Sequence, residues 1–294
     1  MDQLLQGMIC ASITPFTKEN EVDIKSLRAV CRYLVEHKIN GMFPSGTNGE
    51  GILLSVAERK KITEVVINEI SGQIPVVIQC GASNTENTVE IAKHAASAGA
   101  DGVGIMAPYF FAQDEQAIFD YYMAVAHSVS DLPAYIYNIP IYTNNDLLPE
   151  LVERIRKGAP NIVGIKYSFP NLLRLGEYLK LDPSFSALIG CDRLVLSALA
   201  LGAAGTVSGP VAVFPRLFTG LWEAYRKNDI PAAREYQLKI FDTDKALAAF
   251  PGIPLLKTYL KEIGVIATDL CRTPFRSLTA QEARSLMQIV EKYQ

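Results

Sequence analysis

The stretch Asn161-Ile162-Val163-Gly164-Ile165-Lys166 decides how this sequence is interpreted. It is a short apolar run with β-branched residues, bounded by Pro160 and by Ser168-Phe169-Pro170, which is typical of a buried parallel strand. The run ends on a lysine, a residue that is almost never buried without a reason. Burial lowers the pKa of a lysine, and a partly neutral lysine attacks carbonyl groups to form a Schiff base. The stretch alone leaves a second interpretation open, in which Lys166 only marks where the strand reaches solvent.

The composition is that of an ordinary globular protein. The chain has 294 residues, of which 49% are hydrophobic and 20% are charged. This length accommodates two domains or one large α/β barrel. The net charge is −3 and no run of basic residues occurs, which argues against nucleic acid or a membrane as partner. No signal peptide is evident and no apolar run is long enough to span a bilayer, so we expect a cytoplasmic protein.

The cysteines and histidines form no pattern that binds a metal. The five cysteines are widely spaced without a CxxC pair, which predicts reduced thiols in a cytosolic protein. The three histidines are isolated in helix-like stretches, without an HxH or HExxH pairing. The sequence therefore predicts neither a metal site nor a cofactor.

Short apolar segments alternate with helical patterns along most of the chain. Two of these patterns are Ser55–Ile70, which begins with a capping box, and Asp146–Lys157. The eight apolar segments are Ile9–Ile13, Gly41–Pro44, Val76–Cys80, Gly102–Met106, Ala134–Tyr137, Ile162–Lys166, Ala187–Gly190 and Gly205–Ser208. Eight strand–helix units predict a closed (β/α)₈ TIM barrel of the α/β class, with an open doubly wound sheet as the alternative. No GxGxxG motif follows any of these strands, which disfavours dinucleotide binding.

The last part of the chain is helical. We expect residues 1–228 to form the barrel and residues 229–294 to form a C-terminal three-helix appendage packed against it. The three predicted helices are Pro231–Ala248, Pro254–Ile263 and Thr279–Lys292, separated by Pro251-Gly252 and Arg272-Thr273-Pro274.

Chemistry in this class of barrel takes place where strands end and the following loops begin. The loop from Pro44 to Gly51 follows the second strand, and its glycine, hydroxyl and amide residues favour an anion such as a carboxylate. The fifth predicted strand ends at Tyr137 and the sixth at Lys166. A lysine that attacks, a tyrosine that moves protons and a loop that holds an acid group together predict a carbonyl site. A core tyrosine with a satisfied hydroxyl is the alternative for Tyr137.

Several motifs occur in the order and spacing of a known family over nearly the whole chain. They are Ile13-Thr14-Pro15-Phe16, Gly46-Thr47-Asn48-Gly49-Glu50, Ala107-Pro108-Tyr109, Tyr137-Asn138-Ile139-Pro140, Gly164-Ile165-Lys166, Gly190-Cys191-Asp192 and Arg272-Thr273-Pro274-Phe275. By these motifs the chain resembles the pyruvate-dependent class I aldolase superfamily, which includes N-acetylneuraminate lyase, dihydrodipicolinate synthase and 2-keto-3-deoxygluconate aldolase. The resemblance implies a barrel with a helical C-terminal appendage, assembled as a homotetramer.

The resemblance also implies roles for single residues. Lys166 is expected to form the Schiff base with the 2-keto carbon of pyruvate, and Tyr137 to shuttle the proton. Gly46, Thr47 and the loop amides, that of Asn48 among them, are expected to hold the pyruvate carboxylate.

Departures from the family patterns bear on the substrate. Dihydrodipicolinate synthases carry an arginine where this chain has Tyr142, which counts against that activity. Many members supply a second tyrosine to a neighbouring subunit as a proton relay. Here that residue is Phe110, so a relay must use Thr47, Tyr137 and water or substrate. Lys166-Tyr167-Ser168 is similar to the sialate-lyase pattern.

Four further positions complete the predicted substrate-binding set. Gly190 and Asp192 match the residues that hold the polyol tail in sialate lyases. Arg193 stands where those lyases have an acid, and the stretch that begins at Ser208 looks more like the synthases and keto-deoxy-acid aldolases. Arg193 has two interpretations, which are a surface ion pair and a contact to a negative group at the far end of the substrate.

These observations predict a lyase that cleaves a 2-keto-3-deoxy sugar acid to pyruvate and an aldehyde, with Lys166, Tyr137 and Thr47 as catalytic residues. The alternatives on the same scaffold are a 4-hydroxy-tetrahydrodipicolinate synthase-type condensation, a keto-deoxy-acid dehydratase and a protein that binds keto acids without turnover. Loss of Lys166 or Tyr137 would favour the last alternative, and both residues are present.

Overall fold

The structure, a computed structural model, describes residues 5–293 and contains eight strands that alternate with helices. The strands are β1 (Gly7–Cys10), β2 (Gly41–Met42), β3 (Val77–Gln79), β4 (Gly102–Met106), β5 (Ala134–Asn138), β6 (Ile162–Tyr167), β7 (Ser186–Ile189) and β8 (Gly205–Ser208). The α-helices are α1 (Ile24–Glu36), α2 (Val56–Ile70), α3 (Thr85–Ala98), α4 (Glu115–His127), α5 (Pro140–Thr143), α6 (Pro149–Gly158), α7 (Leu172–Leu179), α8 (Val195–Leu201), α9 (Pro215–Arg226), α10 (Ile230–Leu247), α11 (Gly252–Glu262) and α12 (Ala280–Tyr293). Three short 3₁₀ helices lie at η1 (Gly51–Leu53), η2 (Asp192–Leu194) and η3 (Pro210–Ala212).

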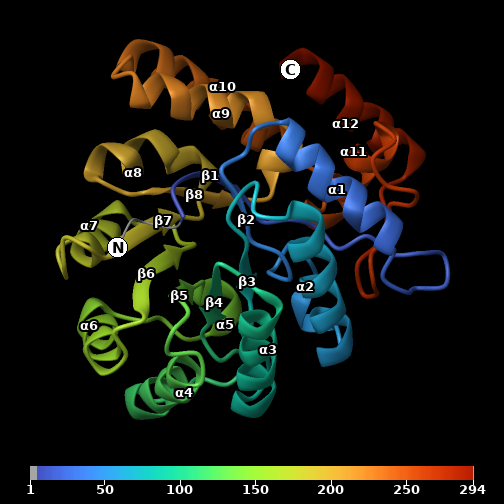
Figure 1. The fold of residues 1–294 in the computed structure, drawn as a ribbon. Coiled ribbons are helices and arrows are strands. Elements are labelled where there is room, and N and C mark those ends of the chain that lie inside the picture. The colour runs from blue at the N-terminus through green and yellow to red at the C-terminus, as the bar shows by residue number, and fades with distance from the viewer. Residues whose placement is uncertain (1–4, 294) are drawn as a thin grey trace.

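The strands form one parallel sheet that curls into a barrel. Their order is β2-β1-β8-β7-β6-β5-β4-β3, and a parallel bridge between Met42 and Val76 brings the two edges together. The helices form a ring around the strands (Figure 1). The predicted TIM barrel is therefore confirmed, and an open doubly wound sheet is excluded because the two edge strands meet.

Local sequence signals account for most of the helix ends. Ser55 caps α2 in the predicted capping box with Glu58, and Asn84 caps α3, which ends at Gly99 in a left-handed conformation. The structure differs from the sequence prediction around β5. The expected helix Asp146–Lys157 begins only at Pro149, as α6, and the short helix α5 precedes it. Both helices have a proline in the first turn, where the fixed φ of proline suits a helix start.

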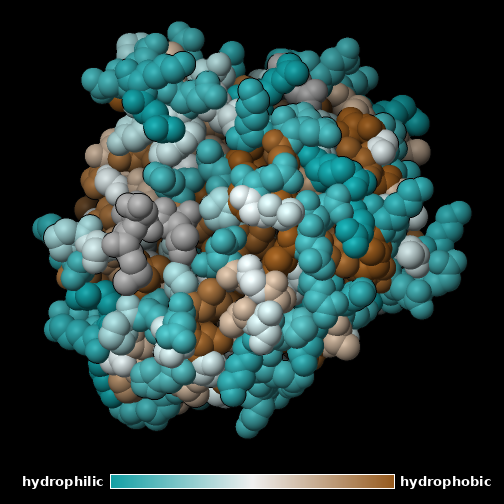
Figure 2. Space-filling model, in the orientation of Figure 1, coloured by the Kyte–Doolittle hydropathy of each residue, from teal (hydrophilic) through white to brown (hydrophobic). Residues whose placement is uncertain are grey.

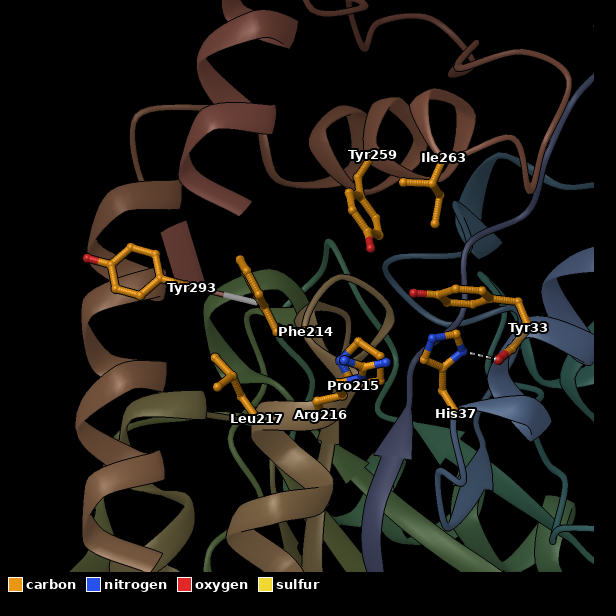
Figure 3. Close-up of a pocket in the computed structure, with 9 residues that line it drawn as sticks. All are labelled: Tyr33, His37, Phe214, Pro215, Arg216, Leu217, Tyr259, Ile263 and Tyr293. Carbon is orange, nitrogen blue, oxygen red and sulfur yellow. Dashed lines mark hydrogen bonds between the residues drawn. The ribbon is translucent and has the colours of Figure 1, made fainter. Parts of the chain in front are cut away.

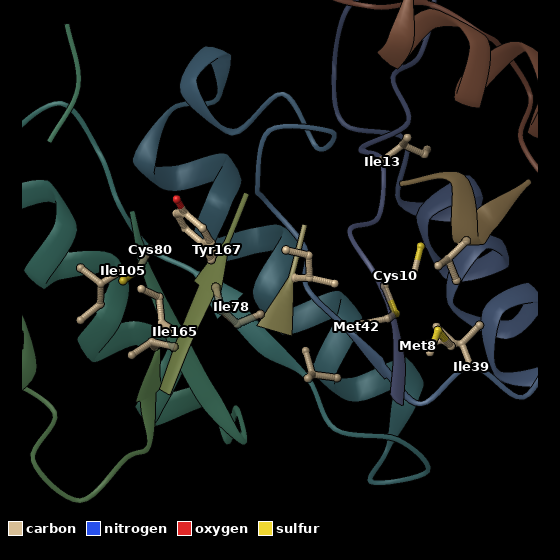
Figure 4. Packing of buried hydrophobic residues seen from close by; sticks show 14 of the residues in the cluster. Met8, Cys10, Ile13, Ile39, Met42, Ile78, Cys80, Ile105, Ile165 and Tyr167 are labelled. Atoms are coloured by element: carbon tan, nitrogen blue, oxygen red, sulfur yellow. The ribbon is translucent and has the colours of Figure 1, made fainter. Parts of the chain in front are cut away.

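The side chains of the strands separate into two buried layers. Alternate residues face the barrel axis or the surrounding helices, as the period of a strand requires. The outward layer includes Met8, Cys10, Ile78, Ile105, Ile165 and Tyr167 (Figure 4). The inward layer includes Ile9, Phe43, Val77, Tyr135, Tyr137 and Leu188. Because Ile165 and Tyr167 face outward, the intervening Lys166 faces the axis.

The C-terminal helices pack on one side of the barrel. Helix α10 lies along α9, and α12 contacts both α10 and α11 (Figure 1). The backbone N–H of Ala267 donates to Ser26 Oγ of α1 at 3.1 Å, which joins the segment after α11 to the barrel. The division into residues 1–228 and 229–294 stays a prediction. In the orientation of Figure 1 the surface is hydrophilic over the outer helices, with hydrophobic residues toward the middle of the face (Figure 2). Within residues 5–293, no helix has both the length and the apolar character that a bilayer crossing requires.

Candidate active site

Lys166 lies in an aromatic pocket inside the barrel. The residue is 3% exposed, and its Nζ lies 3.8 Å from the centre of the Tyr137 ring and 4.5 Å from that of Phe43. Burial lowers the pKa of the Lys166 amine below its ordinary value, while Tyr137 and Asp192 oppose the shift. A larger fraction of the amine is therefore neutral and nucleophilic than on a surface lysine. The interpretation of Lys166 as a solvent-exposed strand end is wrong.

Tyr137 connects Lys166 with the loop after β2. It is the register partner of Lys166 across β5 and β6. Its hydroxyl lies 3.1 Å from Thr47 Oγ1, and the Phe43 ring packs edge-on against its ring at 5.8 Å between centroids. Tyr137 is buried, which agrees with the alternative of a core tyrosine. Its hydroxyl nevertheless contacts Thr47, and its ring lies beside the buried amine of Lys166. The three predicted catalytic residues are thus neighbours in the structure.

The loop after β2 leaves backbone N–H groups without partners. Ser45 and Glu50 both have left-handed backbones, with φ of 58° and 54°, so the chain turns sharply at each end of the loop. A Cβ atom on Gly51 would lie 2.0 Å from the Ser45 carbonyl oxygen, which only glycine avoids. In the described part of the chain, the backbone N–H groups of residues 46–48 donate to no acceptor. Free N–H groups on a curved loop form an anion-binding concavity.

A buried ion pair ties this loop to the C-terminal helices. The Glu50 carboxylate pairs with Lys257 of α11, and both side chains are 0% exposed. Lys257 Nζ donates to the Leu270 carbonyl oxygen at 2.8 Å and lies 4.1 Å from the centre of the Phe16 ring. The second Glu50 oxygen accepts from the backbone N–H of Arg272 at 2.8 Å. The loop that carries Thr47 is therefore held in place by residues from the end of the chain.

A cavity of about 410 Å³ opens beside this loop. Its lining residues come from several strand ends and from the C-terminal region; they are Gly46, Thr47, Asn48, Glu50, Ile52, Gln79, Met106, Tyr109, Tyr142, Thr143, Gly252, Ile253 and Phe275. Glu50 is the one charged residue of this set, and Lys257 neutralises it. The cavity wall is therefore polar and aromatic without a net charge of its own.

Gln79 and Ile253 line the cavity although the sequence prediction left them out. Gln79 is the one amide residue in the otherwise apolar segment Val76–Cys80, and a polar residue at the end of a barrel strand is a signal that the sequence does contain. Ile253 lies in α11, and nothing in its local sequence marks it as part of a site. Its position depends on how the appendage packs.

Asp192 and its neighbours form the other side of the predicted site. Burial raises the pKa of the Asp192 carboxyl to about 7, with Ser208 and Lys166 opposing the shift and Asp244 supporting it. Gly190 lies against Ser168, since a Cβ atom on Gly190 would lie 2.0 Å from Ser168 Oγ. Asp192, Ser208, Gly190 and Ser168 do not line the cavity of about 410 Å³, and neither do Lys166 and Tyr137, which lie deeper in the barrel behind Thr47.

Arg193 has the geometry of a surface ion pair. Its guanidinium binds the Asp244 carboxylate of α10, and its side chain is 43% exposed. It also lies 5.0 Å from the centre of the Phe241 ring. Arg193 does not line the cavity, so the structure offers no support for the interpretation in which it contacts the far end of the substrate.

A second cavity, of about 200 Å³, lies between the barrel helices and the appendage. Tyr33 and His37 of α1 face Tyr259 and Ile263 of α11 across it (Figure 3). None of the predicted site residues lines this second cavity. Within residues 5–293, no group of three or more His, Cys, Asp or Glu side chains is arranged to hold a metal ion.

Known protein sequences match this chain over nearly its whole length. The sequence profile of the dihydrodipicolinate synthetase family matches residues 4–293. The chain is 34% identical over 282 residues to an uncharacterised DapA-like lyase of Halobacterium salinarum, covering 96% of this chain and 92% of that protein. It is 33% identical over 291 residues to a 4-hydroxy-tetrahydrodipicolinate synthase of Syntrophus aciditrophicus, covering 99% of both.

Solved structures show the same fold along the whole chain. The dihydrodipicolinate synthase of Aquifex aeolicus superimposes with a TM-score of 0.93 at 31% identity and 98% coverage of both chains. YagE, a prophage protein of the dihydrodipicolinic acid synthase family from E. coli K12 in complex with pyruvate, gives a TM-score of 0.94 at 28% identity and 99% coverage of both.

Proposed function

The chain belongs to the dihydrodipicolinate synthetase family and is a pyruvate-dependent lyase of the Schiff-base, class I aldolase type, and we propose that it cleaves a 2-keto-3-deoxy sugar acid. The products are pyruvate and an aldehyde. The observation that carries this proposal is the buried amine of Lys166 in contact with Tyr137, whose hydroxyl reaches Thr47. No cofactor takes part, because the lysine itself supplies the electron sink once it forms an imine.

The proposed reaction begins at the keto carbon. The neutral Lys166 amine adds to C2, loss of water leaves an imine, and the imine takes up one proton from solvent to become the electron sink. Tyr137 takes the proton from the hydroxyl at C4, the C3–C4 bond breaks, and its electron pair moves into the imine to give an enamine and an aldehyde. Protonation of C3 and hydrolysis release pyruvate and the free amine. As Tyr137 takes this proton it gives its own to Thr47, which lies 3.1 Å from the Tyr137 hydroxyl, and Thr47 gives its proton to water or to the substrate carboxylate. The same chain runs in reverse to deliver the proton to C3.

The loop after β2 is proposed to hold the substrate carboxylate. The partnerless N–H groups of residues 46–48 and the hydroxyl of Thr47 supply donors on the side of the cavity next to Tyr137. Charge-assisted hydrogen bonds of this kind are about twice as strong as neutral ones. They orient the keto carbon toward Lys166.

A synthase-type condensation is the second candidate, since several relatives are named 4-hydroxy-tetrahydrodipicolinate synthase. That reaction brings a second acid group into the site. No arginine or lysine is among the residues that line the cavity, and Tyr142 occupies the position where a cation would serve. This observation favours cleavage of a sugar acid over condensation with an aldehyde acid.

Reductive trapping tests the covalent step. Treatment with pyruvate and borohydride should modify Lys166 alone, as located by peptide mass spectrometry. Lys257 is the internal control, because it is also buried with a lowered pKa but is paired with Glu50. A label on Lys257 or on any other lysine, with Lys166 unmodified, would refute the proposal. Product analysis on a panel of 2-keto-3-deoxy acids then separates cleavage from dehydration.

We also propose that the protein is a cytoplasmic homotetramer. Large apolar side chains are exposed near the cavity mouth, among them Phe110 at 77% and Tyr142 at 65%. Phe110 has a left-handed backbone (φ 77°), a strained conformation that a contact with another subunit would stabilise. Sedimentation analysis at micromolar concentration checks the assembly, and a monomer there would contradict it.

A further inference from the structure

Gln79 lies at the mouth of the barrel, on the inward face of β3. Val77, two residues earlier, packs in the inward layer, so the alternation of the strand directs Gln79 to the same side. The residue is 1% exposed to solvent and lines the cavity of about 410 Å³. A buried glutamine amide needs hydrogen-bond partners for both its oxygen and its nitrogen.

Arg59 determines which end of the Gln79 amide faces the cavity. Arg59 of α2 is 2% exposed, and its guanidinium donates to the carbonyl oxygens of Gly81 and Gln79 and, at 3.3 Å, to Gln79 Oε1. A guanidinium carries donors only, so it must face the oxygen of the amide rather than its nitrogen. The Gln79 amide nitrogen therefore points away from Arg59 and toward the cavity.

This nitrogen is an unused donor beside a buried cation. In the part of the chain that the structure describes, no acceptor binds the Gln79 amide nitrogen, and no carboxylate pairs with Arg59. Arg59 Nε is also buried without a partner there. An uncompensated buried cation polarises the amide that it holds and strengthens the donor at its other end. The wall at Gln79 is thus suited to an electron-rich oxygen atom.

Gln79 also stands at the right place for the second half of the substrate. The strand order runs β6-β5-β4-β3, so Gln79 is three strands away from Lys166 around the barrel. Neighbouring strands are about 4.8 Å apart, which puts Gln79 across the mouth from the amine, several bonds beyond the carbon that Lys166 attacks. The Gln79 backbone N–H donates to the Pro44 carbonyl oxygen at 3.2 Å, so its side chain lies beside the loop that is proposed to hold the substrate carboxylate. The cavity continues from there along Met106, Tyr109 and Tyr142, and substrate atoms beyond C3 that follow it pass the Gln79 amide.

We propose that Gln79 is a specificity-determining residue that donates a hydrogen bond to an oxygen atom in the aldehyde half of the substrate, with Arg59 as the residue that positions it. The inference rests on the proposed function, since it assumes that the cavity binds a keto acid through Lys166. The oxygen atom belongs to a hydroxyl group or to a carboxylate group. Substrates with the one or the other group respond differently when Gln79 is substituted.

The experiment measures condensation of pyruvate with three aldehydes. Glyceraldehyde offers hydroxyl groups, succinic semialdehyde offers a carboxylate, and butyraldehyde offers no oxygen beyond its carbonyl. Gln79→Met removes the donor at nearly constant size, and the specificity constant should fall about 3- to 10-fold for a hydroxyl contact or about 10- to 100-fold for a carboxylate contact. The value for butyraldehyde should change less than about 2-fold. A uniform change across the three aldehydes, or none, overturns the proposal.

A second variant distinguishes the two sources and guards against misfolding. Gln79→Glu keeps an acceptor for Arg59 and pairs with it, so the fold is retained. A carboxylate at this position accepts from a hydroxyl and repels a carboxylate, so glyceraldehyde should be used within about 3-fold of the parent level while succinic semialdehyde is lost. Loss of both together, with a melting temperature equal to that of the parent, contradicts the hydroxyl source. Gln288→Glu on the exposed face of α12 is the matched control and should change none of the values.

Trapping separates this inference from the function on which it rests. Both Gln79 variants should still form the borohydride-reducible adduct with pyruvate on Lys166, because Gln79 contacts the other half of the substrate. If the parent protein forms no adduct or uses none of the aldehydes, the proposed function fails. If the parent forms the adduct and turns over aldehydes while the variants show unchanged aldehyde preference, only the role of Gln79 fails.

Discussion

Replacing Lys257 by methionine should lower both the melting temperature and kcat, although Lys257 does not line the cavity. The ammonium of Lys257 neutralises Glu50, whose carboxylate is 0% exposed in the loop that carries Thr47. Lys257→Met keeps a long apolar stem beside the Phe16 ring but leaves the Glu50 carboxylate without a cation. The Arg272 N–H then remains as one donor to Glu50, at 2.8 Å.

The magnitude follows from the burial of the pair. Removal of one partner of a buried ion pair costs about 3–5 kcal/mol, because the other charge stays in the interior uncompensated. For a chain of this length, each kcal/mol lowers the melting temperature by roughly 2 °C, so we expect a fall of about 6–10 °C. A displacement of about 1 Å in the Thr47 loop would lower kcat by a factor on the order of 10².

The double variant Glu50→Gln with Lys257→Met tests the reasoning. It removes both charges, and replacement of a whole buried pair by neutral groups is often close to neutral. Thermal melting should therefore show the double variant above Lys257→Met alone. Lys60→Met is the matched control, because Lys60 forms an exposed pair with Glu90 that is worth about 0–1 kcal/mol. A Lys257→Met melting temperature within about 1 °C of the parent, or a double variant no better than the single one, would refute the argument.

Three further predictions address single groups of the site. Tyr137→Phe should still form the imine on Lys166 but lower turnover by a factor on the order of 10² to 10⁴, and full activity in a steady-state assay would leave Tyr137 a structural residue. Arg193→Ala should leave the ratio of kcat/KM for doubly anionic and neutral-tailed substrates unchanged, because Arg193 pairs with Asp244 outside the cavity. A change of about 10- to 100-fold in that ratio would show that Arg193 contacts the substrate after all. Burial raises the pKa of Asp192 from 3.8 to about 7, so the folded state binds this proton more tightly than the unfolded chain and the associated stability is lost as the pH rises through that interval. The melting temperature of Asp192→Asn should therefore rise relative to that of the parent between about pH 4 and about pH 7, and parallel pH profiles would contradict the shift.

The strands and the candidate lysine could be predicted because their signals are local. The segments Gly102–Met106 and Gly205–Ser208 coincide with β4 and β8, since a continuous apolar run bounded by turn residues has few other solutions. Lys166 stood out for the same reason, as a charged residue at the end of such a run. The helix after β5 was placed less well, because Pro140 and Pro149 start two separate helices where one was expected.

The loop residues Gly46, Thr47 and Asn48 could be predicted, but the contacts between distant parts of the chain could not. Arg193 was expected to face either a surface acid or the substrate, and the packing of α10 decides between them by placing Asp244 beside it. The pairing of Glu50 with Lys257 likewise requires that α11 fold back over the mouth of the barrel. No local pattern encodes either contact.

The sequence by itself determined the class of the fold, and it identified Lys166 and Tyr137 as candidates for a carbonyl site. Periodicity, capping and motif spacing act over a few residues, so they can be read along the chain. The tertiary structure alone decided which donors face the cavity. The orientation of the Gln79 amide depends on Arg59 of α2, whose guanidinium donates to the carbonyl oxygens of Gln79 and Gly81 and to Gln79 Oε1. Arg59 and Gln79 are 20 residues apart in the chain and meet only because α2 packs beside the end of β3.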